Sequence, residues 1–323
     1  MKVLVTGGAG YVGSTVALAL LDAGVQPVVL DDLSAGRAEF LRWFPHYVGD
    51  VADRDVLDSV FAEHPDIEIA IHCAARTVVS ESLADPLTYY RENVAKTVQF
   101  VEALLALGCP RLIFSSSAAV YGSAPTRVVT EDAAVSPASP YAMSKVMVER
   151  VLADACAATP LRALSLRYFN PIGCDPQLRT GPYDPTPTHA LGSLLAAWTA
   201  GEPFRIHGAD WDTPDGTPLR DFVHVWDVAR AHLAAALRWR GDGHLVVNVG
   251  SGRGTTVREL ADAFNQQVER PVPIEYDGRR AGDTVGCYAS IARAEDVLGW
   301  RPERSVDDAM VDVLGWAKSE EAR

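Results

Sequence analysis

Short runs of branched apolar residues alternate with amphipathic stretches, and this alternation constrains the fold more than any other feature of the sequence. The runs are VLVT at 3–6, PVVL at 27–30, IEIAIH at 67–72, RLIFSS at 111–116 and ALSLRY at 163–168. Continuous apolar runs are typical of strands that are buried on both faces. The stretches between them, among them 15–23, 87–107 and 141–158, repeat apolar residues at helical spacing. The pattern predicts an α/β fold with a parallel, doubly wound sheet.

The regular alternation ends after Asn170. The following segment, PIGCDPQLRTGPYDPTPTHA, is rich in proline and glycine and predicts loops. We expect a first domain over residues 1–170 and a smaller α/β substrate-binding region over 171–323. A helix at 225–239 and a strand at 245–249 are predicted to return to the first sheet, so that segment 225–249 belongs with the first domain.

Charge and composition exclude several classes of partner. The net charge is −13, and the positive residues are scattered rather than gathered in a stripe, so we expect no nucleic-acid or anionic-membrane partner. The N-terminus leads directly into a predicted strand, and no apolar run approaches about 18 residues. We therefore expect a cytoplasmic protein. Five dispersed cysteines and eight histidines show no disulfide framework and no metal-ligand spacing.

A glycine-rich turn, TGGAGYVGS, follows the first predicted strand. Gly8, Gly10 and Gly13 fit one dinucleotide pattern, and Gly7, Gly10 and Gly13 fit another. Glycine permits the tight turn and the close approach of backbone to a pyrophosphate, while the helix that follows offers free N–H groups to the anion. The context of a strand before the turn and a helix after it favours this reading over a simple turn.

A carboxylate follows at the distance expected for ribose binding. Asp31 lies 21 residues after Gly10, at the end of the second predicted strand, where it would accept hydrogen bonds from an adenosine ribose and repel a 2′-phosphate. NAD is therefore favoured over NADP. Asp32 could also contact the ribose, or it could be a solvated loop residue. Asp50 could reach the adenine, or it could cap a turn. The residues expected to contact NAD here are Gly7, Gly10, Tyr11, Val12, Gly13, Asp31, Asp32, Asp50 and Val51.

Tyr141 and Lys145 stand four residues apart in SPYAMSKVMVER, so they share one face of the predicted helix. A phenol has a pKa near 10, and acting as a base near pH 7 requires lowering it by roughly three units. A nearby ammonium favours the phenolate, and the compact lysine head suits this role better than a forked guanidinium. We expect Lys145 to lower the pKa of Tyr141, and both side chains to reach a nicotinamide ribose and a substrate hydroxyl.

Ser117 completes the predicted catalytic set. It lies just past the carboxyl end of the strand at 111–116, where doubly wound sheets place their ligands. Its hydroxyl could hydrogen-bond the substrate oxygen that Tyr141 deprotonates. The preceding Ser115 and Ser116 are expected to be structural.

The motifs TGGAGYVGS, FSSSAAVYG, SPYAMSK and LRYFNP resemble, in this order and at these intervals, the extended short-chain dehydrogenase/reductase superfamily, which implies a Rossmann-type sheet. The segment GADWDTPDGTPLRDFVHVWDVARAHL is similar to the UDP-glucose (galactose) 4-epimerase family, and the likeness continues almost to the C-terminus. Dehydratases of the superfamily usually carry an Asp-Glu pair after the serine motif. Here Ala118 and Ala119 stand in that place, which argues against a dehydratase.

The resemblance implies an isomerase that oxidises C4 of a nucleotide-linked hexose with tightly held NAD, turns the 4-keto sugar, and reduces it from the other face. Tyr141 would act as the base, Ser117 would hold the oxygen, and Lys145 would anchor the nicotinamide ribose. It adds Asn93 and Tyr168 as cofactor contacts. The positions that it implies for the nucleotide sugar are Ser117, Asn170, His189, His207, Arg220, Arg280, Asp283 and Cys287.

Four departures from the family pattern bear on the substrate. Thr77, next to Arg76, stands where relatives often have a lysine near the pyrophosphate, His207 stands where an aromatic ring often stacks on uracil, and His189 would replace an amide. A TDP- or CDP-sugar therefore stays an alternative to a UDP-sugar. Cys287 stands where glucose-restricted members have tyrosine, which predicts room for N-acetylated hexosamine derivatives, although it could also be a small core residue.

Two further expectations concern assembly and activity. The resemblance and the two long predicted helices, 87–107 and 141–158, predict a homodimer related by a two-fold axis. A nonenzymatic module that binds NAD or a nucleotide sugar is the alternative from another class, since a fold does not fix a function. The presence of Ser117, Tyr141 and Lys145 counts against that alternative.

Overall fold

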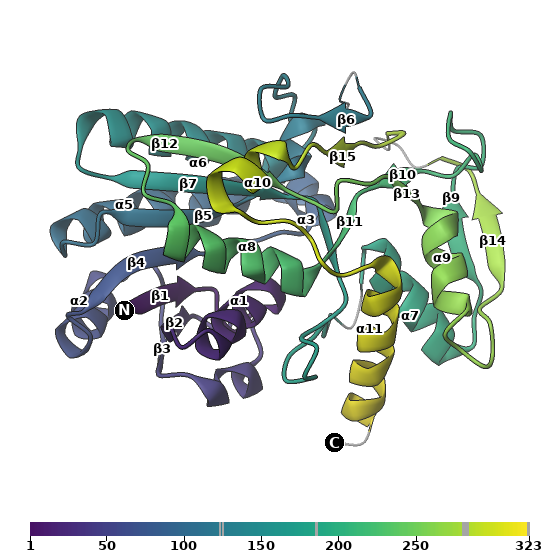
Figure 1. Ribbon diagram of the computed structural model, residues 1–323, viewed down its shortest axis with the longest axis horizontal. Coiled ribbons are helices and arrows are strands. Elements are labelled where there is room, and N and C mark those ends of the chain that lie inside the picture. The colour runs from purple at the N-terminus through teal and green to yellow at the C-terminus, as the bar shows by residue number, and fades with distance from the viewer. Residues whose placement is uncertain (123, 125, 185–186, 280–283, 322–323) are drawn as a thin grey trace.

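The computed structural model of the chain describes residues 1–122, 124, 126–184, 187–279 and 284–321 (Figure 1). A sheet of seven strands forms its centre, in the order β12-β7-β5-β4-β1-β2-β3, with every neighbouring pair parallel. The strands are β1 (Lys2–Thr6), β2 (Gln26–Asp31), β3 (His46–Val48), β4 (Ile67–His72), β5 (Arg111–Ser117), β7 (Arg162–Tyr168) and β12 (His244–Val249). This parallel, doubly wound arrangement confirms the predicted fold class.

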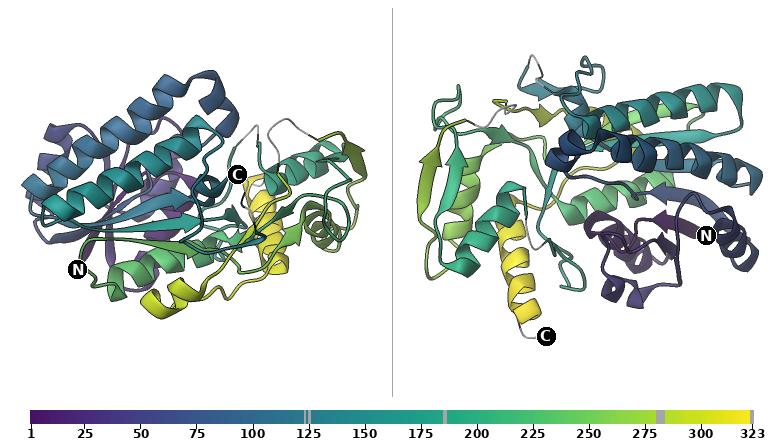
Figure 2. Two further views of the ribbon diagram at one scale, coloured as in Figure 1. Left: turned by 90° about the horizontal axis from the view of Figure 1, so that it is seen from above. Right: turned by 180° about the vertical axis from the view of Figure 1, so that it is seen from behind.

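Helices cover both faces of the sheet, as the view from above shows (Figure 2). The core on one face contains residues of α1 (Tyr11–Asp22), α8 (Val225–Arg238) and α10 (Ala292–Leu298). The core on the other face contains residues of α2 (Arg54–Glu63), α5 (Lys96–Ala106) and α6 (Pro140–Ala158). The central residues of β1, β2, β4, β5 and β7 are largely apolar because both faces of the sheet are covered in this way.

The second region has a core of its own. It is formed by α7 (Ala190–Ala200), α9 (Val257–Asn265) and α11 (Val306–Glu321) with the parallel pair β9 (Phe204–His207) and β14 (Ile274–Asp277). The pair of β6 (Val128–Val129) with β15 (Tyr288–Ala289) connects the two regions. The pair of β8 (Asn170–Ile172) with β11 (Phe222–His224) begins at the last residue of the first region, and the pair of β10 (Leu219–Arg220) with β13 (Thr255–Thr256) lies within the second. The regions therefore meet at the carboxyl ends of the central strands.

The helix predicted over 87–107 is interrupted. After α3 (Val79–Ala84), the chain forms α4 (Pro86–Tyr89), then one wide π turn over Tyr90–Ala95, and then α5. Within the π turn the Asn93 side chain accepts a hydrogen bond from the Arg76 N–H and donates to the Arg76 carbonyl and to Ser144 Oγ. These contacts tie the π turn to two distant segments of the chain, and π turns of this kind often mark functional sites.

Candidate active site and dinucleotide site

The glycine turn joins β1 to α1 at the carboxyl edge of the sheet. Gly7 has φ +70°, and a Cβ there would lie 2.5 Å from the Ala74 nitrogen. A Cβ on Gly13 would lie 2.1 Å from the Gly7 carbonyl oxygen. Gly10 is the N-cap of α1, and among the described residues no side chain caps this helix end. The first-turn N–H groups therefore have no side-chain cap, and among them that of Val12 is available for an anion such as a pyrophosphate, while the Tyr11 N–H lies next to the Tyr183 hydroxyl.

The predicted ribose carboxylate is held in place by the same turn. Asp31 is almost fully buried at the end of β2, and it accepts hydrogen bonds from the Ala9 N–H (2.9 Å) and the Leu33 N–H (2.8 Å). Burial raises the pKa of Asp31, with a smaller contribution from Asp32. Asp32 itself is exposed and accepts hydrogen bonds from Ser34 N–H and Oγ, which fits its alternative as a solvated loop residue.

Asp50 lies beyond β3 and has two partners. Its carboxylate accepts a hydrogen bond from the Ala52 N–H (2.9 Å) and an ion pair from Lys96 Nζ (2.5 Å). Burial opposes ionisation, but the Lys96 contact prevails and lowers the pKa of Asp50. Asp50 thus caps its turn and forms an ion pair with Lys96. Val51 beside it packs into the core on that face.

Three consecutive serines at the end of β5 each lie next to one residue of α6. The Ser117 side chain lies near enough to the Tyr141 phenol to favour its ionised form. The Ser115 carbonyl accepts a hydrogen bond from Lys145 Nζ (2.8 Å), and Ser116 Oγ donates to Glu149 Oε1 (2.5 Å). Tyr141, Lys145 and Glu149 are spaced four residues apart, so they lie on one face of α6. The structure therefore brings the predicted catalytic set together and fixes it at three adjacent points.

The protonation state of this set differs from the sequence prediction. Burial raises the pKa of the Tyr141 phenol, while the nearby Ser117 side chain acts in the opposite direction. Burial also lowers the pKa of Lys145 to about 8. Lys145 Nζ lies 5.9 Å from the centre of the Tyr141 ring, and its hydrogen bond goes to Ser115. The expectation that Lys145 lowers the pKa of Tyr141 is wrong for the chain alone, because desolvation of the phenol dominates.

Glu149 was not singled out in the sequence, although it is a charged residue on the buried face of α6, eight residues after Tyr141. Arg167 on β7 donates to both of its carboxylate oxygens, at 2.9 and 2.6 Å, and both side chains are almost fully buried. Arg167 also donates to Tyr121 Oη at 3.0 Å. A charged residue at helical spacing on an otherwise buried face was the available signal for this pair.

Two more predicted cofactor residues lie at this edge of the sheet. Asn93 is buried, and its amide joins the segment after β4 to α6 through Arg76 and Ser144. Tyr168 ends β7, and burial raises its pKa well above the ordinary value, with the Tyr141 phenol adding to the effect. Both residues therefore lie beside the catalytic set rather than at the surface.

The residues predicted for the nucleotide sugar lie where the second region meets the first. Asn170 Nδ2 donates to the Asp221 carbonyl, and Arg220 Nη1 donates to the carbonyls of Leu219 and Thr284. Asp221, which the sequence analysis missed, is fully buried and accepts hydrogen bonds from Ser251 and from the Ala289 N–H. This carboxylate holds two loops around the strand that carries Arg220.

Three other predicted residues have more local roles. His189 is the N-cap of α7, where its Nδ1 accepts the Gly192 N–H, so this nitrogen does not act as the donor that an amide would supply. His207 ends β9 and lines a cavity of about 960 Å³ together with Phe204 and Asp277. Cys287 is half-buried against a small apolar cluster. Arg280 and Asp283 lie outside the described residues.

The described residues offer neither a metal site nor a membrane span. No group of three or more His, Cys, Asp or Glu side chains is arranged to hold a metal ion there. None of the helices in that part of the chain is both long and apolar enough to span a membrane.

A parallel sheet with an uncapped glycine turn, a ribose carboxylate and a serine, tyrosine and lysine at one edge defines a dinucleotide-dependent enzyme of the short-chain dehydrogenase/reductase class. The model of the NAD dependent epimerase/dehydratase family matches residues 3–250, and the chain belongs to this family. NAD is therefore its cofactor, and the uncapped turn and buried Asp31 fit that dinucleotide.

Relatives and solved structures agree with this family. The chain is 43% identical to UDP-glucose 4-epimerase of Azospirillum brasilense over 98% of this chain and 92% of the relative. UDP-glucose 4-epimerase from Bifidobacterium longum, solved with NAD+ and UDP, is 32% identical, covers 99% of both chains and superposes with a TM-score of 0.91. The UDP-Glc/GlcNAc 4-epimerase from Campylobacter jejuni is 35% identical, covers 98% of this chain and 99% of the other, and gives a TM-score of 0.84.

Proposed function

We propose that the chain is an isomerase that inverts C4 of a UDP-linked hexose and interconverts UDP-glucose and UDP-galactose. The observation that carries the proposal is the placement of Ser117, Tyr141 and Lys145 at the edge of the sheet next to the glycine turn. The relative from Azospirillum brasilense, a UDP-glucose 4-epimerase matched over nearly its whole length, supports the substrate class. Ala118 and Ala119 supply no acid or base for an elimination.

Each residue has a defined part in the reaction. NAD, when bound, would supply the hydride acceptor and donor for the sugar C4. Tyr141 takes the proton of the 4-hydroxyl, and Ser117 holds that oxygen by a hydrogen bond. Because burial raises the pKa of Tyr141, its ionisation depends on positive charge at the site, and Lys145 is the cation of the chain that lies nearest on the same helix face. Tyr141 returns the proton after the 4-keto sugar has been turned and reduced from its other face.

The parts of the chain divide between the two ligands. Residues 1–170 with segment 225–249 would hold NAD, and residues 171–323 would hold the nucleotide sugar. Support for this division comes from the position of β12 beside β7 in the sheet and from the separate core of the second region. The expected sugar-nucleotide contacts are Asn170, His189 through its Nε2, His207, Arg220, Arg280, Asp283 and Cys287. UDP is favoured over TDP and CDP, since the solved relatives from Bifidobacterium longum and Campylobacter jejuni are epimerases of UDP-sugars.

The half-buried Cys287 supports a wider substrate range. A cysteine leaves more space than a tyrosine, and the relative from Campylobacter jejuni is a UDP-Glc/GlcNAc 4-epimerase. N-acetylglucosamine and N-acetylgalactosamine derivatives of UDP are therefore expected substrates. Turnover of plain and N-acetylated sugars should be compared between the wild type and Cys287→Tyr. The variant is expected to lose the N-acetylated activity selectively, and an unchanged ratio of the two activities would exclude this role.

The central experiment uses purified protein without added NAD. A panel of UDP-, TDP- and CDP-hexoses is incubated with the wild type and with Tyr141→Phe, and the C4 epimers are separated. We expect turnover of the UDP sugars by the wild type and its loss in the variant, with the fold retained. Sugar nucleotides that return with unchanged stereochemistry would favour the nonenzymatic module.

The same family likeness suggests a homodimer, and the surface offers a place for it. Five large apolar side chains on α3, α4 and α6 are exposed, namely Val79, Leu83, Leu87, Met143 and Met147. Leu87 is 74% exposed and Leu83 is 63% exposed, so the patch is costly to leave in water. A second copy related by a two-fold axis would cover it. Sedimentation that shows a monomer at micromolar concentration would overturn this part of the proposal.

We place the protein in the cytoplasm. All five cysteines are free thiols in the structure, and two of them, Cys109 and Cys174, are buried. Unpaired thiols fit a reducing compartment. Fractionation of cells that express the protein tests this placement.

A further inference from the structure

Residues 174–183, here called the bridging segment, run from the second region back onto the glycine turn. They follow β8 and precede α7, yet their side chains contact the first domain. Arg179 forms a two-pronged ion pair with Asp22, the last residue of α1, with both distances 2.8 Å. The buried Asp175 holds the same guanidinium at 2.7 Å. One end of α1 is thus tied to the bridging segment by a pair of charge-assisted contacts.

The other end of α1, where a pyrophosphate binds, is also contacted. The Tyr11 hydroxyl donates to the Gly173 carbonyl at 2.7 Å, just before the bridging segment. At its far end Tyr183 lies over the turn: its hydroxyl oxygen is 4.0 Å from the point where a Cβ would sit on Gly10. The same hydroxyl donates to the Ala35 carbonyl at 2.8 Å. Tyr183 therefore lies between the phosphate-binding turn and the loop that follows the ribose carboxylate.

The groups that shift the pKa of Tyr183 agree with this position beside the glycine turn. Burial raises the pKa of Tyr183 to about 12, and the negative charge of Asp31 adds to the effect, whereas Arg37 and the Tyr11 N–H lower it. Asp31 is the carboxylate expected at the adenosine ribose, and the Tyr11 N–H belongs to the anion-binding turn. The Tyr183 phenol is close enough to the Asp31 carboxylate and to the Tyr11 N–H for each of them to shift its pKa.

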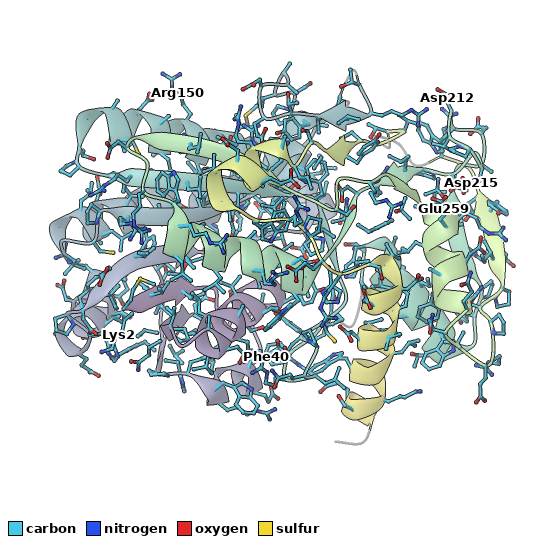
Figure 3. The ribbon with its side chains drawn as sticks, in the orientation of Figure 1. Lys2, Phe40, Arg150, Asp212, Asp215 and Glu259 are labelled. Carbon is cyan, nitrogen blue, oxygen red and sulfur yellow. The ribbon has the colours of Figure 1, made fainter. Side chains whose placement is uncertain are left out.

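The C-terminal helix holds the bridging segment in this position. Trp316 Nε1 donates to the Pro182 carbonyl at 2.8 Å, and Phe40 packs edge-on against Tyr183 and Trp316, with ring centres 5.5 and 6.0 Å apart. Figure 3 shows Phe40 on the side of the first domain that faces α11. The guanidinium of Arg37 lies 5.6 Å from the Tyr183 ring centre and pairs with Glu320 of α11.

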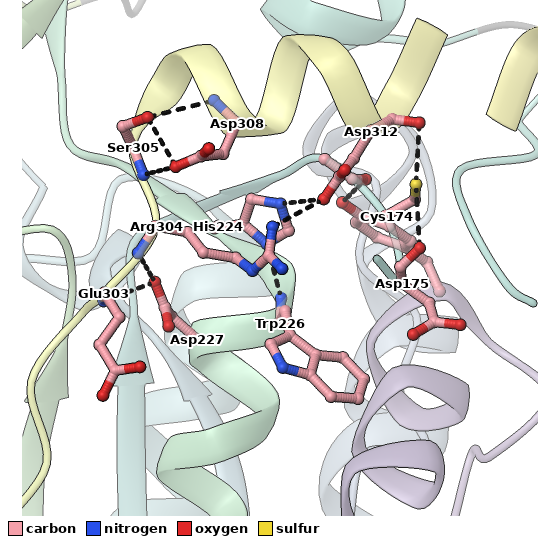
Figure 4. Close-up of polar contacts among 12 residues, drawn as sticks. Cys174, Asp175, His224, Trp226, Asp227, Glu303, Arg304, Ser305, Asp308 and Asp312 are labelled. Atoms are coloured by element: carbon pink, nitrogen blue, oxygen red, sulfur yellow. Dashed lines mark hydrogen bonds and ion pairs between the residues drawn. The ribbon is translucent and has the colours of Figure 1, made fainter. Parts of the chain in front are cut away.

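The first residue of the bridging segment is held by the same helix. Cys174 Sγ donates to the Asp312 carbonyl at 3.1 Å, and the Asp312 carboxylate pairs with His224 and Arg304 (Figure 4). Both ends of the bridging segment are therefore attached to α11, and its middle is attached to α1. An element held from both sides in this way has little freedom to leave the turn.

From these contacts we propose that the bridging segment, through Tyr183, covers the adenosine and pyrophosphate half of the NAD site and slows the release of the dinucleotide. The proposal rests on the proposed function in one respect, that NAD stays bound between the two hydride transfers. A redox-neutral isomerase gains from slow release, because a reduced cofactor lost in mid-reaction would leave an oxidised sugar behind. Tyr183 and Arg179 act here as positioning residues, remote from the sugar.

The test measures the cofactor and needs no sugar. Protein loaded with radiolabelled NAD is mixed with excess unlabelled NAD, and the rate at which label leaves is followed for the wild type, Tyr183→Ala, Tyr183→Phe and Arg179→Gln. Tyr276→Phe is the matched control, because Tyr276 is a tyrosine on the outer strand β14 whose hydroxyl accepts a hydrogen bond from Arg258. The affinity of ADP-ribose for the NAD-free chain is measured in parallel.

We expect Tyr183→Ala and Arg179→Gln to release NAD about tenfold faster and to bind ADP-ribose about tenfold more weakly, while Tyr183→Phe, which loses one hydrogen bond, changes each by about threefold to fivefold. Tyr276→Phe should match the wild type. Release rates within about twofold of the wild type for Tyr183→Phe and Arg179→Gln would overturn the proposal, whether or not Tyr183→Ala folds. A chain that keeps NAD as expected but epimerises no sugar would refute the proposed function and leave this inference standing.

Discussion

Replacing Glu149 by methionine tests whether the buried ion pair under the active site stabilises the protein. Glu149 accepts three hydrogen bonds, two from Arg167 and one from Ser116. Methionine has a similar volume but accepts none of them. The substitution therefore leaves a buried guanidinium without its counter-charge and a fully buried hydroxyl without its acceptor.

The two losses set the expected magnitude. Removing one partner of a buried ion pair costs about 3–5 kcal/mol, and an orphaned buried hydroxyl costs about 1 kcal/mol or more. We expect the free energy of unfolding to fall by about 4 kcal/mol or more. Arg167 keeps its contacts with Tyr121 and with the Glu131 carbonyl, so the charge stays in the core rather than reaching solvent.

The double variant Glu149→Met/Arg167→Met separates the charge from the packing. With both charges gone, the orphaned groups are neutral, and Tyr121 keeps its hydrogen bond to Asn248, so we expect a loss of about 1–2 kcal/mol. Urea unfolding followed by tryptophan fluorescence at pH 7 measures Glu149→Met, Arg167→Met and the double variant. The reasoning is refuted if Glu149→Met costs less than about 1 kcal/mol, or if the double variant loses the sum of the two single losses.

Three further predictions follow from the site and the surface. Gly13→Ala should abolish NAD binding in a fluorescence titration, because its Cβ would lie 2.1 Å from the Gly7 carbonyl oxygen, whereas Gly278→Ala, with open space around it, should bind normally. Burial lowers the pKa of His232 to about 4, below its unfolded value near 6.5, so its contribution to stability is complete above pH 6.5 and is lost as the pH falls toward 4. In urea unfolding between these pH values, the free energy of unfolding of the wild type should fall by about 1.4 kcal/mol per pH unit more than that of His232→Gln. Equal slopes for the two proteins would contradict this prediction. Leu87→Lys should yield a monomer in sedimentation velocity, since Leu87 is the most exposed side chain of the apolar patch, and an unchanged dimer would place the interface elsewhere.

The sequence predicts those parts of the fold that depend on neighbours in the chain. The strand expected at 67–72 is observed with the same bounds, because a continuous apolar run has few ways to be buried other than in the middle of a parallel sheet. The helix expected over 87–107 was interrupted by the π turn at Asn93. The residues that Asn93 contacts there, Arg76 and Ser144, are 17 and 51 residues away, and no local pattern contains them.

The same distinction holds for the site. The spacing of Tyr141 and Lys145 predicts that they lie together, since residues four apart share a helix face. The glycine pattern predicts the phosphate-binding turn. The pKa of Tyr141 could not be predicted, because it depends on how much of the phenol the fold buries. Tyr183 was missed because it reaches Ala35 across 148 residues of sequence. A tyrosine in a proline-rich loop gives no sign of such a contact.

The strand β12 closes the central sheet from a position three-quarters of the way along the chain, beside β7. During synthesis, β7 forms an open sheet edge with unpaired backbone groups. Its partner β12 is made only after roughly eighty more residues. A nascent chain in this state is prone to pair with another chain instead. A recombinant fragment that ends at Asn170 would keep that edge permanently. The first domain of this protein therefore has to be produced together with the rest of the chain.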